Sequence, residues 1–217
     1  MKTHILQLLA FLLLADWVSA EPSIGSMVPR AAQRGTTVTL EIWGGGLEHV
    51  HSVWVEDTDL DFRIVPDVPK PELRIEVGIP ADHGPKTYGI RVVSHAGVSA
   101  SAEFRVTGEP CVLETDTTHN LAANAQLLDV PSIIQGTVGE EGERDLYAID
   151  VEAGQELLIE GLTIGHGATS GFSLGAGWRM VFALYRQGEN WFEGKRIVRL
   201  GEGNSPPRLR YHFEEGG

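Results

Sequence analysis

The chain has 217 residues, enough for one or two domains, and its 30 Asp and Glu residues against 17 Lys and Arg give a formal net charge of −13. A chain this acidic lacks the basic face that nucleic acid or an anionic membrane requires, so we exclude both as partners. Its single cysteine, Cys111, excludes an internal disulfide, so burial of apolar surface must supply the stability.

Residues 1–20 have the pattern of a secretory signal peptide. A basic start at Lys2, an apolar stretch and a small-residue end lead to a cleavage point before Glu21. Asp16 interrupts the apolar stretch, which is too short to span a membrane comfortably, and no second run of spanning length follows. We therefore expect a secreted, periplasmic or cell-surface protein with no membrane span after cleavage.

Residues 21–107 alternate apolar and polar side chains in short runs, which is typical of strands that bury one face in a sandwich. Turn residues separate the runs, and no segment sustains a helical period. The apolar positions are Val38, Leu40, Ile42, Leu73, Ile75, Val77, Tyr88, Ile90, Val92, Phe104 and Val106, and less cleanly His51, Val53 and Val55. This pattern predicts an immunoglobulin-like β-sandwich.

The three glycines that end the run TTVTLEIWGGGL raise the alternative of a phosphate-binding loop. A dinucleotide fingerprint needs G-x-G-x-x-G at the start of a helix, and a P-loop needs a lysine after its last glycine. Gly44-Gly45-Gly46 is followed by Leu47 to His51, which contain no lysine. We therefore predict a tight turn, in which glycine supplies a positive φ.

The segments IGSMVPRAAQRGTTVTLEIWGGGL and GPKTYGIRVVSHAGVSASAEFRV resemble the IPT/TIG family of immunoglobulin-like domains. The resemblance covers nearly all of residues 22–107 and is to copies in large exported proteins of planctomycete-type bacteria. It implies an interaction role and carries no catalytic residues.

Residues 108–128 are predicted to form an acidic linker, in which residues 120–128 could add a short helical turn. Residues 129–217 are again β-rich. Alternation places these side chains inward: Tyr147, Ile149, Val151, Leu157, Ile159, Leu209, Tyr211 and Phe213. A further strand is predicted over residues 180–185.

The segment AQLLDVPSIIQGTVGEEGERDLYAIDVEAGQELLIEG, with FALYRQGEN after it, resembles the bacterial pre-peptidase C-terminal (PPC) domain. That resemblance implies a jelly-roll-like β-sandwich of the kind appended to secreted proteases, with relatives that bind matrices such as collagen. In the family, a turn like Glu214-Glu215-Gly216-Gly217 precedes one more strand. Either that strand is absent here, leaving an unpaired sheet edge, or the sequence is part of a longer protein, which we favour.

The PPC resemblance also implies a calcium site. In collagen-binding relatives an acidic linker of the form E-x-E-x-N-D supplies calcium ligands, and Glu114 and Asp116 fall on its two acidic positions. Thr118 and His119 replace the Asn and Asp, which should weaken a site for a hard cation. Calcium at Glu114 and Asp116 is therefore a hypothesis, and no other cofactor is expected.

Two further motifs lack the neighbouring residues that their functions require. The carboxylates of segment 57–61 are spaced like the start of a calcium loop, but the glycine and glutamate of an EF-hand are missing, which favours a solvated acidic turn. Segment 171–175 matches G-x-S-x-G, but no helix-strand alternation surrounds it and no aspartate follows Ser173. A secreted serine hydrolase using Ser173 and His212 is kept as the alternative function.

The histidines and tryptophans give weaker signals. The histidines show no zinc-site spacing, so scattered surface histidines are expected. Most of Trp43, Trp54, Trp178 and Trp191 are expected in the core, whereas an exposed tryptophan could dock a sugar or a peptide.

These observations predict an all-β exported protein of two sandwich domains, over residues 21–107 and 129–217. The predicted function is non-catalytic binding, adhesion or an accessory role in a larger secreted or cell-surface protein. The expected partner is an extracellular protein or polysaccharide matrix, or a covalently linked downstream domain.

Overall fold

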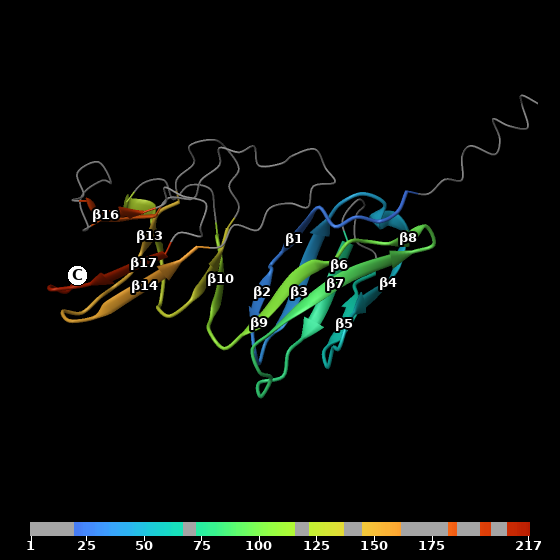
Figure 1. The fold of residues 1–217 in the computed structure, drawn as a ribbon, viewed down its shortest axis with the longest axis horizontal. Coiled ribbons are helices and arrows are strands. Elements are labelled where there is room, and N and C mark those ends of the chain that lie inside the picture. Colours follow the sequence, from blue (N-terminus) through green and yellow to red (C-terminus); the bar gives the residue numbers. More distant parts are fainter. Residues whose placement is uncertain are drawn as a thin grey trace, which may run out of the picture. The chain divides into compact units, whose positions relative to one another are not determined.

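The computed structural model describes residues 20–66, 73–115, 122–136, 145–161, 182–185, 196–200 and 208–217. The chain divides into two compact units, Met1–Gly108 and Glu109–Gly217. In the described ranges each unit consists of β-strands and short 3₁₀ turns, so the all-β prediction is confirmed (Figure 1). Within these ranges no helix has the length and apolar character that crossing a membrane requires.

The first sheet of the first unit is antiparallel, with the strand order β1–β3–β6–β5. Its strands are β1 (Ser26–Val28), β3 (Thr37–Trp43), β6 (Leu73–Gly78) and β5 (Asp61–Ile64). In the register of β3 with β6, Leu40 lies opposite Ile75, and both are fully buried. The period-two pattern of the sequence therefore places one face of this sheet against the core.

The second sheet has the strand order β2–β9–β7–β4, and β8 adds to it by pairing with β7. Its strands are β2 (Ala31–Gln33), β9 (Ala102–Thr107), β7 (Lys86–Ser94), β4 (Val50–Val55) and β8 (Gly97–Val98). Only β2 and β9 run parallel; the other pairs in this sheet are antiparallel. In immunoglobulin lettering, β1 to β7 are strands A, A′, B, C, D, E and F, and β9 is strand G. The sheets then have the orders A-B-E-D and A′-G-F-C, which is the immunoglobulin-type arrangement predicted for this unit.

Apolar side chains from both sheets form one core. The predicted inward residues that are buried are Leu40, Ile42, Leu73, Ile75, Val77, Tyr88, Ile90, Val92, Phe104 and Val106. Val38, Val53 and Val55 are partly buried and pack against the same cluster. His51, by contrast, is exposed. Its predicted inward position is wrong because the register of β4 shifts between Val50 and Ser52, which makes His51 an extra residue in the strand.

The three-glycine segment is a turn, as predicted. Gly46 has φ 64° and caps the 3₁₀ helix Leu47–His49. A Cβ on Gly44 would overlap the carbonyl oxygen of Ser23, so the backbone there approaches too closely for any side chain.

The described strands of the second unit form four separate pairs, two of them parallel and two antiparallel. The parallel pairs are β10 (Cys111–Leu113) with β12 (Ile133–Gln135), and β11 (Gln126–Leu127) with β13 (Tyr147–Ala148). The antiparallel pairs are β14 (Glu156–Glu160) with β17 (Arg208–His212), and β15 (Phe182–Tyr185) with β16 (Arg196–Leu200). The jelly-roll arrangement of this unit stays a prediction.

Part of the segment expected as a linker is paired with the second unit. β10 and β11 both lie inside residues 108–128, and the backbone N–H of Glu114 also donates to the carbonyl oxygen of Gln135 at 2.9 Å. The helical turn expected in this segment is the 3₁₀ helix Ala122–Asn124. Backbone pairing with distant strands orders these residues despite their low apolar content.

The predicted inward side chains at the end of the second unit are largely confirmed. Leu209 and Phe213 are buried, while Tyr211 is half-buried and its ring centre lies 5.0 Å from that of Phe213. The strand expected to include Tyr147, Ile149 and Val151 is shorter than predicted, because β13 ends at Ala148. Val151 instead exchanges two backbone hydrogen bonds with Gly217, at 2.8 and 2.9 Å.

Replacing Leu40 with alanine should lower the free energy of unfolding of the first unit by about 2–5 kcal/mol, because it opens a cavity between the sheets. The exposed neighbour Thr39 provides the matched control, and Thr39→Ala should change the free energy by no more than about 0.5 kcal/mol. Urea unfolding followed by circular dichroism measures both. Equal effects of the two substitutions would contradict the sandwich core.

Candidate functional site

The predicted calcium residues are only partly described. Glu114 is half-buried, and its Oε1 accepts a hydrogen bond from the hydroxyl of Tyr147 at 3.0 Å. Burial, and then this hydrogen bond to Glu114, raise the pKa of Tyr147. Asp116 lies outside the described residues, and within the described part of the chain no three His, Cys, Asp or Glu side chains gather as a metal site. The calcium hypothesis therefore stays a prediction.

The alternative catalytic pair is also untested. Ser173 lies outside the described residues, and His212 is an exposed residue at the end of β17, opposite Glu156. Cys111 is a half-buried free thiol, and burial raises its pKa to about 11, so little reactive thiolate forms at neutral pH.

The carboxylates of the acidic turn have protein partners. Asp61 forms an ion pair with Arg63 at 2.8 Å, and Asp59 accepts hydrogen bonds from two side chains of the core edge. Asp57 has a positive φ of 47°, and its carbonyl oxygen accepts a hydrogen bond from Lys86. These interactions favour a structural turn over a calcium loop.

Tyr88, His83 and Asp59 form a hydrogen-bonded cluster at the start of β7. The Tyr88 hydroxyl donates to Asp59 Oδ1 at 2.7 Å and lies 2.7 Å from Nε2 of His83, which is also 3.2 Å from Asp59 Oδ1. Both neighbours of Nε2 offer oxygen acceptors, which assigns the ring proton to that nitrogen. The His83 side chain is only 6% exposed, and its buried Nδ1 has no partner among the described residues.

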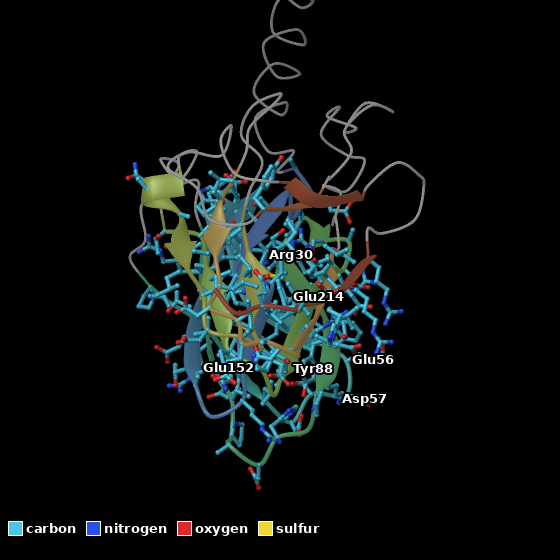
Figure 2. The ribbon with its side chains drawn as sticks, turned by 90° about the vertical axis from the view of Figure 1, so that its left-hand side faces the viewer. Arg30, Glu56, Asp57, Tyr88, Glu152 and Glu214 are labelled. Atoms are coloured by element: carbon cyan, nitrogen blue, oxygen red, sulfur yellow. The ribbon has the colours of Figure 1, made fainter. Side chains whose placement is uncertain are left out.

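Lys86 extends the cluster to the acidic turn. Its Nζ lies 4.8 Å from the ring centre of Tyr88 and donates to the carbonyl oxygen of Asp57 at 2.5 Å (Tyr88 and Asp57 are labelled in Figure 2). A tyrosine near the start of strand F that hydrogen-bonds at the E–F corner is a feature of immunoglobulin-type sandwiches. Here the cluster ties the β4–β5 turn and the β6–β7 turn to the edge of the core.

Trp43 and Trp54, two of the four tryptophans expected mostly in the core, are exposed, so the expectation that most of the four are buried is wrong. The exposed fraction is 39% for Trp43 and 48% for Trp54. Each follows a core residue in its strand, Ile42 and Val53 respectively, so alternation turns it outward. The other two, Trp178 and Trp191, lie outside the described residues.

Trp54 and Arg91 make the most distinctive group on the outer face of the second sheet. They lie opposite each other in the β4–β7 register, and the Arg91 guanidinium carbon is 5.9 Å from the centre of the Trp54 ring. Arg91 Nη1 donates to the carbonyl oxygen of Ser99 at 3.0 Å, which fixes the guanidinium. We call this pair, together with the outward-facing residues Ser52, Thr87, Gly89 and Val93 of the same two strands, the Trp54 face.

Gly89 keeps part of the Trp54 face flat. A Cβ at this position would lie 2.5 Å from Ser101 Oγ, so a larger residue would displace that hydroxyl. The sequence contained a signal for the outward direction of Trp54, because Val53 and Val55 flank it and both are apolar. The sequence contained no signal for the contact between Trp54 and Arg91, since these residues come from strands that are not joined by a hairpin.

No protein-family model matches the chain, and no curated protein matches it. Five chains of known structure do match. One of them is SGBP-B of the Bacteroides ovatus mixed-linkage glucan utilization locus, solved in complex with a mixed-linkage heptasaccharide. It is 15% identical to this chain, with a TM-score of 0.33, over 64% of this chain and 28% of that one.

The hydrogen bonds to Asp59 should make stability depend on pH in acid. Donation from Tyr88, and then from His83, lowers the pKa of Asp59 to about 2, below the value of about 3.9 expected in the unfolded chain. Because the folded state favours the ionised form, this stabilisation is complete above about pH 4 and is lost as the pH falls toward 2. Tyr88→Phe removes the strongest donor and should raise the pKa of Asp59, which carboxyl NMR titration measures directly.

Unfolding curves give a second measurement of the same effect. Between pH 5 and pH 2 the urea midpoint of the wild type should fall more steeply than that of Asp59→Asn, which has no carboxyl to titrate at this position. Parallel pH profiles for the two proteins would show that Asp59 is not held in its ionised form by the cluster.

Proposed function

We propose that this chain is a non-catalytic binding module of an exported protein, and that its first unit holds a neutral polysaccharide chain on the Trp54 face. The observation that carries the proposal is the 48% exposed Trp54 ring beside the fixed guanidinium of Arg91. An aromatic ring can pack against the apolar face of a sugar ring, and oriented N–H donors can bind its hydroxyl groups.

The chemistry of each group supports this ligand class. The apolar C–H face of a pyranose packs on an indole ring, which is rigid and loses little conformational entropy on binding. Arg91 uses Nη1 to bind Ser99, and the remaining donors of a guanidinium can bind sugar hydroxyl groups. The hydroxyls of Ser52 and Thr87 face outward on the same sheet, on strands that pair with each other.

The surroundings of Trp54 favour a polysaccharide over a protein partner. A stable protein interface buries about 800 Å² on each side, with an apolar centre. On the Trp54 face the ring stands beside an arginine, a glycine, two hydroxyl side chains and the half-buried Val93, and the other strongly exposed apolar side chain of this sheet is Val98, which lies opposite Val93. The net charge of −13 disfavours a polyanionic ligand, which leaves neutral polysaccharides.

The remaining parts of the proposal rest on the sequence. The leader pattern over residues 1–20 supports export, and the IPT/TIG and PPC resemblances support an accessory or adhesive role in a larger secreted or cell-surface protein. An exported binding module would bring attached domains to an insoluble glycan and needs no catalytic residue of its own.

Trp54→Ala should weaken polysaccharide binding at least about tenfold, because it removes the stacking surface. Affinity electrophoresis in gels that contain neutral β-glucans, xylans or mannans measures the change. Trp43→Ala is the matched control: it removes another exposed tryptophan, from the other sheet, and should retain wild-type binding. Failure of the wild type to bind any of these polysaccharides, or equal losses in both variants, would refute the Trp54 face.

The export component has its own test. Mass spectrometry of the native protein from the culture or cell envelope should find Glu21 as the first residue, because the leader is removed before it. Recovery of the protein from the cytoplasm with residues 1–20 attached would contradict export.

A further inference from the structure

The clearest second feature of the first unit is a pair of histidines, His51 and His95, whose rings lie close together. The ring centres of His51 and His95 are 4.9 Å apart, with an angle of 44° between the ring planes. Both residues are exposed, so solvent and dissolved ions reach this part of the surface. The two residues lie far apart in the sequence and meet because β4 pairs with β7.

A β-bulge and a hydrogen-bonded turn position the two rings. His51 is the extra residue in the β-bulge of β4, where Val50 pairs with Ser94 and Ser52 pairs with Val93. His95 follows Ser94 directly in the β7–β8 turn. That turn is fixed because the Ser94 hydroxyl accepts a hydrogen bond from the backbone N–H of Ala96 at 3.1 Å. Bulges commonly re-aim a side chain next to a site, and this one turns His51 toward His95.

The separation of the rings fits two ligands of one metal ion. An imidazole nitrogen binds a transition metal at about 2.1 Å, which places the ion about 3.2 Å from the ring centre. Two rings that meet one ion at the angles of square or tetrahedral geometry therefore have centres about 4.5–5.2 Å apart. The observed 4.9 Å lies inside this range.

We propose that His51 and His95 bind one divalent transition-metal ion, of the class Cu²⁺, Ni²⁺ or Zn²⁺, with water completing the coordination. Neutral imidazole suits these ions, whereas Ca²⁺ and Mg²⁺ prefer oxygen ligands. The negative net charge raises the local concentration of cations. The site differs from the calcium hypothesis at Glu114 in its ligands, its metal class and its unit.

Isothermal titration of the full chain with ZnCl₂ and with CuCl₂ tests the site. The wild type should bind one ion at this position, with Cu²⁺ tighter than Zn²⁺, and CaCl₂ should give no signal from it. His51→Ala and His95→Ala should each weaken binding at least about tenfold, because either substitution reduces a two-point site to one ligand. The double variant should be little weaker than either single variant.

Matched variants and a second readout complete the test. His49→Ala removes an exposed histidine two residues from His51 and should keep wild-type affinity, as should Trp54→Ala, which separates this site from the Trp54 face. Electron paramagnetic resonance of the Cu²⁺ complex should show two coupled nitrogens, and one in each single variant. Absence of saturable binding, or equal affinity in His51→Ala, His95→Ala and His49→Ala, would overturn the proposal.

Discussion

The apolar layer between the two sheets of the first unit is the constraint on which its surface depends. Leu40, Ile75 and Phe104 are fully buried in this layer. Strict alternation along each strand then determines which residues remain outside. Trp54 faces solvent because Val53 and Val55 on either side of it pack toward the core. A shift of one residue in β4 would bury the tryptophan and expose both valines, so the core itself determines the direction of the Trp54 face.

Tyr88 connects this apolar layer to the polar edge of the sandwich. Its ring packs in the core at 6.1 Å from the ring centre of Phe62, while its hydroxyl reaches Asp59 and His83. Burying a tyrosine requires a partner for its hydroxyl, and these two residues meet that requirement from separate turns. The start of β7, the strand that carries Arg91, is thereby anchored on both its apolar and its polar side.

The sequence predicted the core of the first unit well because alternation is a local signal that burial enforces. It predicted contacts less well where they depend on register between distant strands. The pairing of Trp54 with Arg91 follows from the β4–β7 register. The hydrogen bond from the Tyr147 hydroxyl to Glu114 joins residues that are 33 positions apart. The sequence predicts a linker where β10 and β11 form for the same reason, since short parallel pairs need no alternating apolar run of their own.

The bulge in β4 shows how a structural requirement and a functional one can be separated. Val50 and Val53 both pack toward the core although they are three residues apart, so one extra residue must be accommodated between them. Among the described strands β4 also lies at the edge of its sheet, and a bulge there discourages pairing with another chain. These two reasons explain why the extra residue exists, and an exposed residue of almost any type would satisfy them. They give no reason for an imidazole at position 51 that lies next to a second imidazole at position 95, and metal coordination supplies one.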